Sequence, residues 1–498
     1  MKNLLLLIGI LGLWLSSSLL ANNVQVNNIS LTGQNTAQGF TMVEFDLSWD
    51  NSWRISVGPS NWDAVWVFVK YRVNNGEWKH AALNYVNGNN DGHNISSGYT
   101  IKGDNQQSTV VNSANGVYLY RSTDGSGKVS LQNVQLRWNY ASNGVANSDL
   151  VDVKVFAIEM VYVPQGAFEL GSPAPLDTLE EGKFYRYPNL SDPYTVSSEA
   201  AITVGTSNGN LYYSQYGDRG GPIPAGYPKG YDAFYCMKYE VSQEQWLAFF
   251  NLLTPTQQVN LDVTAPNRKG SDFAIARNGV SWDPAGGDAT TTNPFVPINF
   301  VSQVETSSYL DWACLRYMSE FEFTKACRGP LPAVTGEFAW GSSRIQQNYQ
   351  YTLLNPGTAD ELISNPGTNV GNAVNIENFS ARNYGPLRCG VFAASANTTN
   401  REETGGSYYG IMEMSGNLFE AVARASSPNG RNYTSAHGNG IINALGYGTV
   451  FRWSSLNLGL RGGAFYWAKK GSCIANRRFS DTFIMDEKVG FRGVRTAP

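Results

Sequence analysis

Apolar and polar residues alternate along much of the first third of the chain. Between Val65 and Val73 every odd position is valine or Tyr71, and the even positions become polar toward the end of the run. Alternation with a period of two, built from β-branched and aromatic residues, predicts a strand with one buried face. Asn75-Gly76 follows and predicts a hairpin, because both central residues of a type I′ turn need positive φ.

Further short apolar runs rich in β-branched and aromatic residues recur in the same part of the chain, at residues 24–31, 42–49, 117–121, 134–140 and 151–158. No segment in this part has the pattern of a convincing helix. We therefore expect an antiparallel β-sandwich over residues 22–157, of the immunoglobulin or fibronectin type.

The sequence pattern changes near residue 160, and beyond it the starts of helices can be predicted from capping boxes. In a capping box, an N-cap hydroxyl and the side chain three residues later each satisfy a free backbone amide. Ser242, Ser302 and Ser319 begin such boxes. The helices are expected to extend to residue 253, to about residue 317 and to residue 328. After Gly329 the chain is rich in glycine, asparagine and serine, which predicts long irregular segments held by local contacts such as metal ions.

The first residues predict export. Lys2 precedes an apolar run at residues 4–15 that is too short to span a bilayer, and Ala21 offers a small residue for cleavage. This pattern is typical of a secretory signal peptide over residues 1–21. No cysteine stands at the cleavage point, so no lipid anchor is expected, and no later stretch is long enough for a membrane span. The mature protein is expected in the periplasm, outside the cell or at the cell surface.

Net charge limits the kinds of partner, and cysteine content limits the number of disulfides. The formal net charge is −4, without a basic block, so nucleic acid is not an expected partner. The chain has only five cysteines, a small and odd number that does not fit a disulfide framework. We expect them to be small buried residues with at most one or two bridges.

From residue 158 to the end, a series of short motifs follows one order. They are residues 160–168, 235–242, 297–302, 318–323, 338–341, 410–420, 461–463 and 490–495. In sequence and order these motifs resemble the formylglycine-generating enzyme, or sulfatase-modifying factor, family, of which residues 158–498 look like a divergent bacterial member. The resemblance implies an α+β, C-type-lectin-like fold with much irregular structure, usually stabilised by calcium, behind the N-terminal β-sandwich.

The resemblance also implies a copper site, which this chain departs from. In the family, two cysteines that follow the Arg-Gly-Gly motif (residues 461–463 here) bind copper and use oxygen to oxidise a substrate cysteine to formylglycine. Here Trp467 stands at the first position, and Cys473, the one thiol nearby, aligns with a neighbouring position. Cu(I) prefers soft thiolate ligands, and one thiolate cannot replace two. Copper is therefore not expected, and no catalytic residue is assigned.

Calcium is the cofactor that the resemblance implies for the motif at residues 410–420, called the Gly-Asn motif after Gly416-Asn417. The family's ligands fall on the side chains of Glu413 and Glu420 and on the backbone carbonyls of Gly416 and Leu418. Hard oxygen ligands from a glycine-containing turn suit Ca²⁺. The alternative is that Glu420 only caps the turn or forms an ion pair within it.

A second calcium site of the family maps to Asn375 and Ile376. Its acidic partner is expected near Cys389-Gly390, where this sequence has no carboxylate.

Histidines and arginines add no catalytic site. The three histidines are too scattered for a metal site and are expected as solvated or hydrogen-bonded surface residues: His80, His93 and His437. Three arginines beside glycine motifs are interpreted as buried donors to loop carbonyls, because the guanidinium is a rigid fork of five donors: Arg461, Arg492 and Arg495.

Two functions fit these observations. The first is a non-catalytic binding or structural module of the bacterial envelope or cell surface, with a protein or glycan partner. The alternative is a metal- or oxygen-dependent enzyme, an oxidoreductase like the formylglycine-generating enzymes, that uses a rearranged site. The cleft beside Trp467 separates them, because a plugged cleft would exclude the family's oxidation chemistry.

Overall fold

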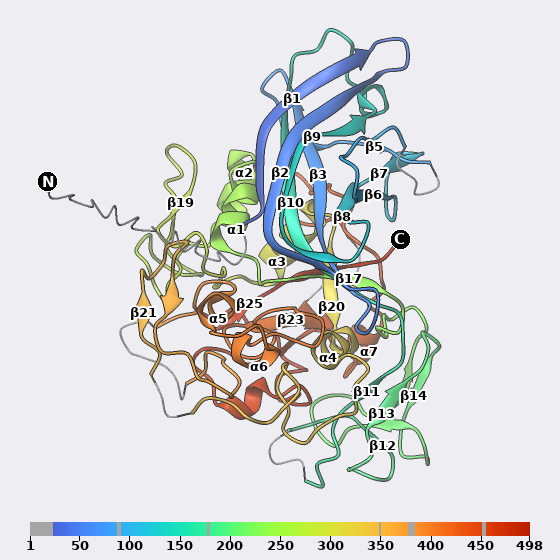
Figure 1. Cartoon of the computed structure of the whole chain (residues 1–498), viewed down its shortest axis with the longest axis vertical. Helices are drawn as coiled ribbons and strands as arrows, with labels where there is room; N and C mark the ends of the chain where they lie inside the picture. Colours follow the sequence, from blue (N-terminus) through green and yellow to red (C-terminus); the bar gives the residue numbers. More distant parts are fainter. Residues whose placement is uncertain (1–22, 87–90, 177–179, 348–349, 377–383, 451–454) are drawn as a thin grey trace, which may run out of the picture.

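The computed structural model describes residues 23–498 except 87–90, 177–179, 348–349, 377–383 and 451–454 (Figure 1). The predicted signal peptide over residues 1–21 lies outside the described residues. Within them, no helix has both the length and the apolar character needed to cross a membrane.

The N-terminal part is built from antiparallel strands, as the alternation predicts. One sheet has the order β1 (Gln25–Asn35), β2 (Phe40–Arg54), β9 (Gly125–Trp138), β5 (Leu83–Asn84) and β7 (Ser113–Ala114). Facing it are β10 (Val151–Val163), β3 (Asp63–Val73), β8 (Gly116–Arg121) and β6 (Tyr99–Asp104). Buried and partly exposed positions alternate along β2, and Phe45 and Trp49 share a core with Val67 of β3.

The sheet of β3 and β10 continues into the rest of the chain. β10 pairs with β3 on one side and with β17 on the other, where Val161 lies opposite Cys236. Nine strands of the resulting 11-stranded sheet run in the order β24-β23-β20-β26-β17-β10-β3-β8-β6, while β4 (Lys79–His80) pairs with β3 and β25 (Val489–Gly490) pairs with β23 beside this path. Its C-terminal members are β17 (Phe234–Met237), β20 (Arg316–Ser319), β23 (Phe419–Ala423), β24 (Leu458–Arg461) and β26 (Gly493–Thr496). The expected domain boundary at residue 157 falls inside β10.

Short elements make up most of the remaining regular structure. The strands are β4 (Lys79–His80), β11 (Phe168–Leu170), β12 (Tyr185–Arg186), β13 (Tyr194–Val196), β14 (Ile202–Val204), β15 (Leu211–Tyr212), β16 (Gly221–Ile223), β18 (Val280–Ser281), β19 (Thr290–Thr291), β21 (Leu353–Leu354), β22 (Leu362–Ile363) and β25 (Val489–Gly490). The short helices are α5 (Val391–Ser395), α6 (Arg401–Thr404), α7 (Pro428–Arg431) and the 3-10 turns η1 (Tyr140–Asn143), η3 (Ser455–Asn457) and η4 (Lys469–Ser472). Together with long irregular segments, these elements confirm the expected α+β class with much irregular structure.

The capping boxes place the starts of three helices correctly. α1 (Gln243–Phe250), α3 (Gln303–Trp312) and α4 (Glu320–Arg328) begin behind Ser242, Ser302 and Ser319, each with both bonds of the box present. The predicted end of α3 near residue 317 is wrong. Cys314 has a φ of 58°, a left-handed conformation that stops the helix before β20 begins. A fourth box, with Thr254 as N-cap, begins α2 (Pro255–Leu261), which the sequence analysis missed.

The hairpin after β3 is present, but its turn lies one residue earlier than predicted. Asn74 and Asn75 have φ values of 50° and 59°, and the Gly76 N–H donates to the Val73 carbonyl at 2.9 Å. Two consecutive residues with positive φ are the requirement of a type I′ turn. Asparagine tolerates this region, so Asn74-Asn75 occupies the turn and Gly76 follows it.

Two histidines lie in the interior, which corrects the expected surface placement. His93 and His437 are buried and accept backbone N–H bonds at 3.0 Å and 2.9 Å, from Arg137 and Thr496. Burial lowers the pKa of His93 to about 4 and the pKa of His437 well below its usual value, so both are neutral. All five cysteines are also buried, and none forms a disulfide in the described part of the chain.

Candidate functional site

The Gly-Asn motif forms a tight turn that leads into β23. Glu413, Gly416 and Asn417 all have positive φ, at 54°, 91° and 63°. A Cβ on Gly416 would lie 2.5 Å from the carbonyl oxygen of Val374, so only glycine allows this close approach. The Asn417 N–H donates to the same carbonyl at 3.1 Å. The turn is therefore packed directly against residues 374–376.

Three buried carboxylates lie around this turn and influence one another's pKa: Glu240, Glu413 and Glu420. Glu420 lies in β23 and is one of the expected calcium ligands. It forms a bidentate ion pair with Arg492, with N–O distances of 2.6 Å and 2.7 Å. Glu413 accepts a hydrogen bond from the Gly390 N–H at 2.9 Å through Oε1. Its Oε2 is buried and finds no hydrogen-bond partner among the described residues.

The third carboxylate, Glu240, was not predicted as a site residue. It lies just before the N-cap of α1 and accepts bonds from the Asn417 side chain at 2.5 Å and from the Leu418 N–H at 3.0 Å. Its signal in the sequence is a glutamate between apolar residues in the strand-to-helix motif at residues 235–242. Distance along the chain hid its contact with the Gly-Asn turn.

Burial dominates the electrostatics of this cluster. It raises the pKa of Glu413 to about 7 and that of Glu240 well above its usual value. Repulsion from Glu420 raises both further. Arg492 lowers the pKa of Glu420, yet burial leaves that pKa above its ordinary value. Two of the three carboxylates thus lack an ion-pair partner of their own in the described part of the chain.

The expected calcium ligands are brought together in part. Glu413, Gly416, Leu418 and Glu420 share the turn, while the Ile376 N–H donates to the Trp467 carbonyl at 3.1 Å on the neighbouring segment. Among the described residues, no group of three or more His, Cys, Asp or Glu side chains is arranged to hold a metal ion. The free oxygen of Glu413 fits a calcium ligand. The oxygens of Glu420, each bonded to Arg492, retain lone pairs for a cation.

The position of the family's first thiol is filled by a packed indole. The Trp467 ring makes edge contacts with Phe419 and Phe479, at centroid distances of 5.9 Å and 4.9 Å. Gly471 lies so close to this indole that a Cβ there would overlap it. The space beside the Arg-Gly-Gly motif is therefore occupied by side chains.

The neighbouring thiol is not set up for chemistry. Cys473 is buried, and its Sγ lies 3.7 Å from the carbonyl oxygen of Gly336. Burial raises the pKa of this thiol to about 12, so it is protonated at neutral pH. Without a metal ion, this protonated, buried thiol is neither a thiolate nucleophile nor a preformed copper ligand.

The predicted arginine anchors are buried, as interpreted from the sequence. Arg492 also donates to the carbonyls of Met237 and Met412. Arg495 pairs with Asp104 of β6 at 2.6 Å, so it ties the C-terminal strand to the N-terminal part of the sheet. These guanidinium groups hold the frame around the turn.

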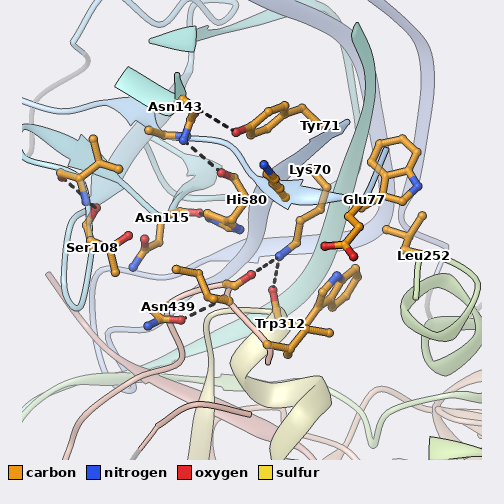
Figure 2. Close-up of a pocket in the computed structure, with 18 of the residues that line it drawn as sticks. Lys70, Tyr71, Glu77, His80, Ser108, Asn115, Asn143, Leu252, Trp312 and Asn439 are labelled. Atoms are coloured by element: carbon orange, nitrogen blue, oxygen red, sulfur yellow. Dashed lines mark hydrogen bonds between the residues drawn. The ribbon is translucent and has the colours of Figure 1, made fainter. Parts of the chain in front are cut away.

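A cavity at another place in the molecule was not predicted. It has a volume of about 350 Å³ and lies where β3 and β4 meet α3 and the loop at residues 439–442 (Figure 2). Lys70, a lysine within the apolar run of β3, contributes to its wall. A lone lysine inside such a run is the signal that sequence reasoning passed over.

Comparison with known proteins places the chain in a family. The model of the sulfatase-modifying factor enzyme 1-like domain matches residues 152–497. Among solved structures, PvdO from Pseudomonas aeruginosa is similar at 17% identity, with 68% of this chain and 95% of that chain covered and a TM-score of 0.30. Treponema denticola variable protein 1 is similar at 12% identity, with 69% and 96% covered and a TM-score of 0.31. No curated protein matches the chain.

Proposed function

The chain belongs to the sulfatase-modifying factor enzyme 1-like family, and from this premise we propose that it is a non-catalytic binding or structural module of the bacterial envelope or cell surface. In this proposal the family's scaffold is kept and its copper-dependent oxidation is lost. The partner is a protein or a glycan at the envelope.

The packing of Trp467 is the observation that carries this proposal. An indole in contact with Phe419 and Phe479 stands where the resemblance places the first copper thiolate. Cys473, the thiol closest along the chain, is buried and protonated. Copper(I) chemistry needs soft, deprotonated sulfur ligands, which this region does not offer.

An oxidation assay tests the loss of catalysis. The purified mature chain is incubated with Cu(I), oxygen and a sulfatase peptide that carries the substrate cysteine, with an authentic formylglycine-generating enzyme as the positive control. Mass spectrometry of the peptide should show the thiol unchanged. Conversion of the thiol to the aldehyde at a rate that depends on this protein would overturn the proposal in favour of a rearranged enzyme.

Calcium at the Gly-Asn turn is the cofactor that we propose. Glu240, Glu413 and Glu420 are three buried carboxylates around the turn, and Arg492 is paired with Glu420. Without an ion, burial favours protons on Glu240 and Glu413; a divalent cation would replace such a proton, and oxygen ligands are those that Ca²⁺ prefers. The residues that would hold it are Glu413, Gly416, Leu418 and Glu420, with a second, weaker site at Asn375 and Ile376.

Export is part of the same proposal. It is supported by the basic residue, short apolar run and small residue within positions 1–21. Secretion of a fusion that carries residues 1–40 ahead of a reporter enzyme tests it. A reporter that stays in the cytoplasm would contradict export.

A further inference from the structure

The cavity beside β3 is built from both parts of the shared sheet. Its lining side chains come from β3 and β4, from the connection of α1 to α2, from the end of α3 and from the loop at residues 439–442 (Figure 2). A volume of about 350 Å³ is within the range of pockets that hold small organic ligands.

Lys70 supplies an unusual group to this cavity. Its side chain is buried, and its ammonium donates to the carbonyls of Trp312 at 2.8 Å and Gly440 at 3.0 Å. An ammonium has three donors, so one N–H has no hydrogen-bond partner among the described residues, although the Nζ lies over the rings of Phe68 and Trp312 at 5.6 Å and 5.1 Å from their centroids. No carboxylate forms an ion pair with Lys70 in the described part of the chain. Asp311 acts on Lys70 only from beyond ion-pair distance, and a buried cation without a directly paired counter-charge is costly.

The protonation state of Lys70 keeps this charge in place. Burial lowers its pKa to about 8, while Cys314 and Asp311 act in the opposite direction. The amine is therefore still mainly protonated at neutral pH. Glu77 points toward Lys70 from the rim of the cavity (Figure 2) but is exposed, so solvent screens its charge.

The indole of Trp312 lies beside this amine. The Lys70 Nζ is 5.1 Å from the ring centroid, and Figure 2 shows the indole nitrogen on the same side as the amine. Phe68 and Phe156 pack against the ring edge-on, at centroid distances of 5.1 Å and 4.8 Å, and fix its orientation. An indole N–H is a donor only, so it adds a second donor to the ammonium.

Several other polar groups of the lining are already engaged, whereas the charged Glu77 and Lys79 are exposed at its rim. Gln257 uses both ends of its amide on the backbone of residues 254 and 443. Asn143 accepts from the Ala82 N–H and donates to the His80 carbonyl. The rest of the wall includes apolar side chains: Trp78, Leu252, Leu253, Ile441 and Ile442. The lining thus suits an apolar body better than a sugar with many hydroxyl groups.

We infer that this cavity binds a small organic acid, whose carboxylate accepts hydrogen bonds from Lys70 and Trp312 and whose apolar ring packs against Trp78 and the leucines of the wall. The ligand carboxylate supplies the counter-charge that Lys70 lacks. This inference rests on the proposed role as a binding module and names the ligand class.

Calorimetric titration of the mature chain, residues 22–498, tests the inference with phenylacetate and with its neutral analogue phenylacetamide. Phenylacetate should bind and phenylacetamide should not. Lys70→Met should weaken phenylacetate binding by about 30-fold or more, because the charged partner is removed. Trp312→Phe keeps the ring but removes the N–H, and should weaken binding by about fivefold.

Two variants of other charged residues in the lining serve as matched controls. Lys79→Met removes an exposed lysine of the lining and should leave the affinity within about twofold. Glu77→Gln removes a negative charge from the rim and should strengthen binding by about twofold.

Three results would overturn the inference. They are no binding of phenylacetate by the folded wild type, binding of phenylacetamide as tight as that of phenylacetate, or wild-type affinity for phenylacetate in both Trp312→Phe and a folded Lys70→Met. Tighter binding of glucuronate than of phenylacetate would contradict the apolar body. The outcome is independent of the oxidation assay, since loss of catalysis can hold whether or not this ligand class is right.

Discussion

At the scale of single residues, the Gly-Asn turn shows which contacts can be predicted from the spacing of residues within a motif. Glu413 and Glu420 lie seven positions apart on one turn, so the sequence alone could bring them together. Glu240 joins them from a segment near α1, and its bond to the Leu418 N–H at 3.0 Å spans 178 positions along the chain. Burial raises the pKa of both Glu240 and Glu413, and burial is a property of the fold that neither motif contains.

The buried Glu413 predicts a pH dependence of stability in calcium-free buffer. Its pKa is raised from 4.5 to about 7, so the native state holds a proton that the unfolded chain releases. The stabilisation is complete below pH 4.5 and is lost as the pH rises through 7, on the order of 3 kcal/mol in total. Denaturant unfolding of wild type and Glu413→Gln, each with a chelator, measures the difference between their pH profiles.

Glu413→Gln should have the flatter profile, because an amide does not titrate and can still accept the Gly390 N–H. Calcium should stabilise the wild type at pH 7 and have little effect on the variant. Identical pH profiles for the two proteins would contradict the raised pKa, and equal stabilisation of both by calcium would contradict the role of Glu413 as a ligand.

Trp467 gives a second prediction at this scale. Trp467→Cys restores a thiol at the family's position but removes an indole packed on Phe419 and Phe479. We expect a loss of about 2 kcal/mol in the free energy of unfolding, because a cavity replaces a half-buried ring. Copper should still not bind tightly, since binding would have to remove the proton of the buried Cys473 thiol, whose pKa is raised to about 12. Tight copper binding by this variant would show that one substitution separates the chain from the enzymes.

At the scale of elements, local signals located where helices begin more reliably than where they end. The predicted end of α4 at residue 328 is correct, whereas α1 ends at Phe250 and α3 at Trp312, each before its predicted end. The serine capping boxes fixed the starts of α1, α3 and α4, because a cap depends on residues within one turn. The end of α3 depends on Cys314 turning left-handed before β20, which residue type alone does not specify. Alternation likewise identified β3 and β10, but pairing partners such as β17 depend on contacts between distant segments.

The buried ion pair between β26 and β6 predicts a large effect of a small change. Arg495 and Asp104 are fully buried and 2.6 Å apart. Asp104→Asn leaves the guanidinium without its counter-charge and should cost about 3 to 5 kcal/mol. The exposed pair of Arg72 and Asp152, at 2.7 Å, is the matched control, and Asp152→Asn should cost less than about 1 kcal/mol.

Chemical denaturation of both variants measures these costs. Equal losses in the two variants would mean that the buried pair does not hold β26 to the N-terminal part of the sheet.

At the scale of the whole molecule, the N-terminal strands and the family domain share one sheet. Their buried side chains pack in one core that includes residues from both sides of the expected boundary at residue 157. Trp66 of β3 donates from its indole to the Ala313 carbonyl at 2.9 Å, and Lys70 donates to the neighbouring Trp312. Residues from both parts belong to the same buried cluster, Trp66 and Phe68 with Trp246 and Tyr309 among them. Composition and motifs suggested two units in series, whereas β10 carries the sheet through the expected boundary.

This continuity predicts cooperative unfolding. Calorimetry of the mature chain should give one transition, because the N-terminal strands cannot separate without breaking the β10–β17 pairing and the shared core. Two resolved transitions, one for each part, would contradict it.

The central claim is that this member of the family keeps the scaffold and has lost the copper chemistry. Metal analysis of the mature protein tests it most directly, after exposure to both calcium and Cu(I) and removal of unbound ions. The account predicts calcium at roughly one ion per chain and no retained copper. Copper retained in stoichiometric amount would contradict it.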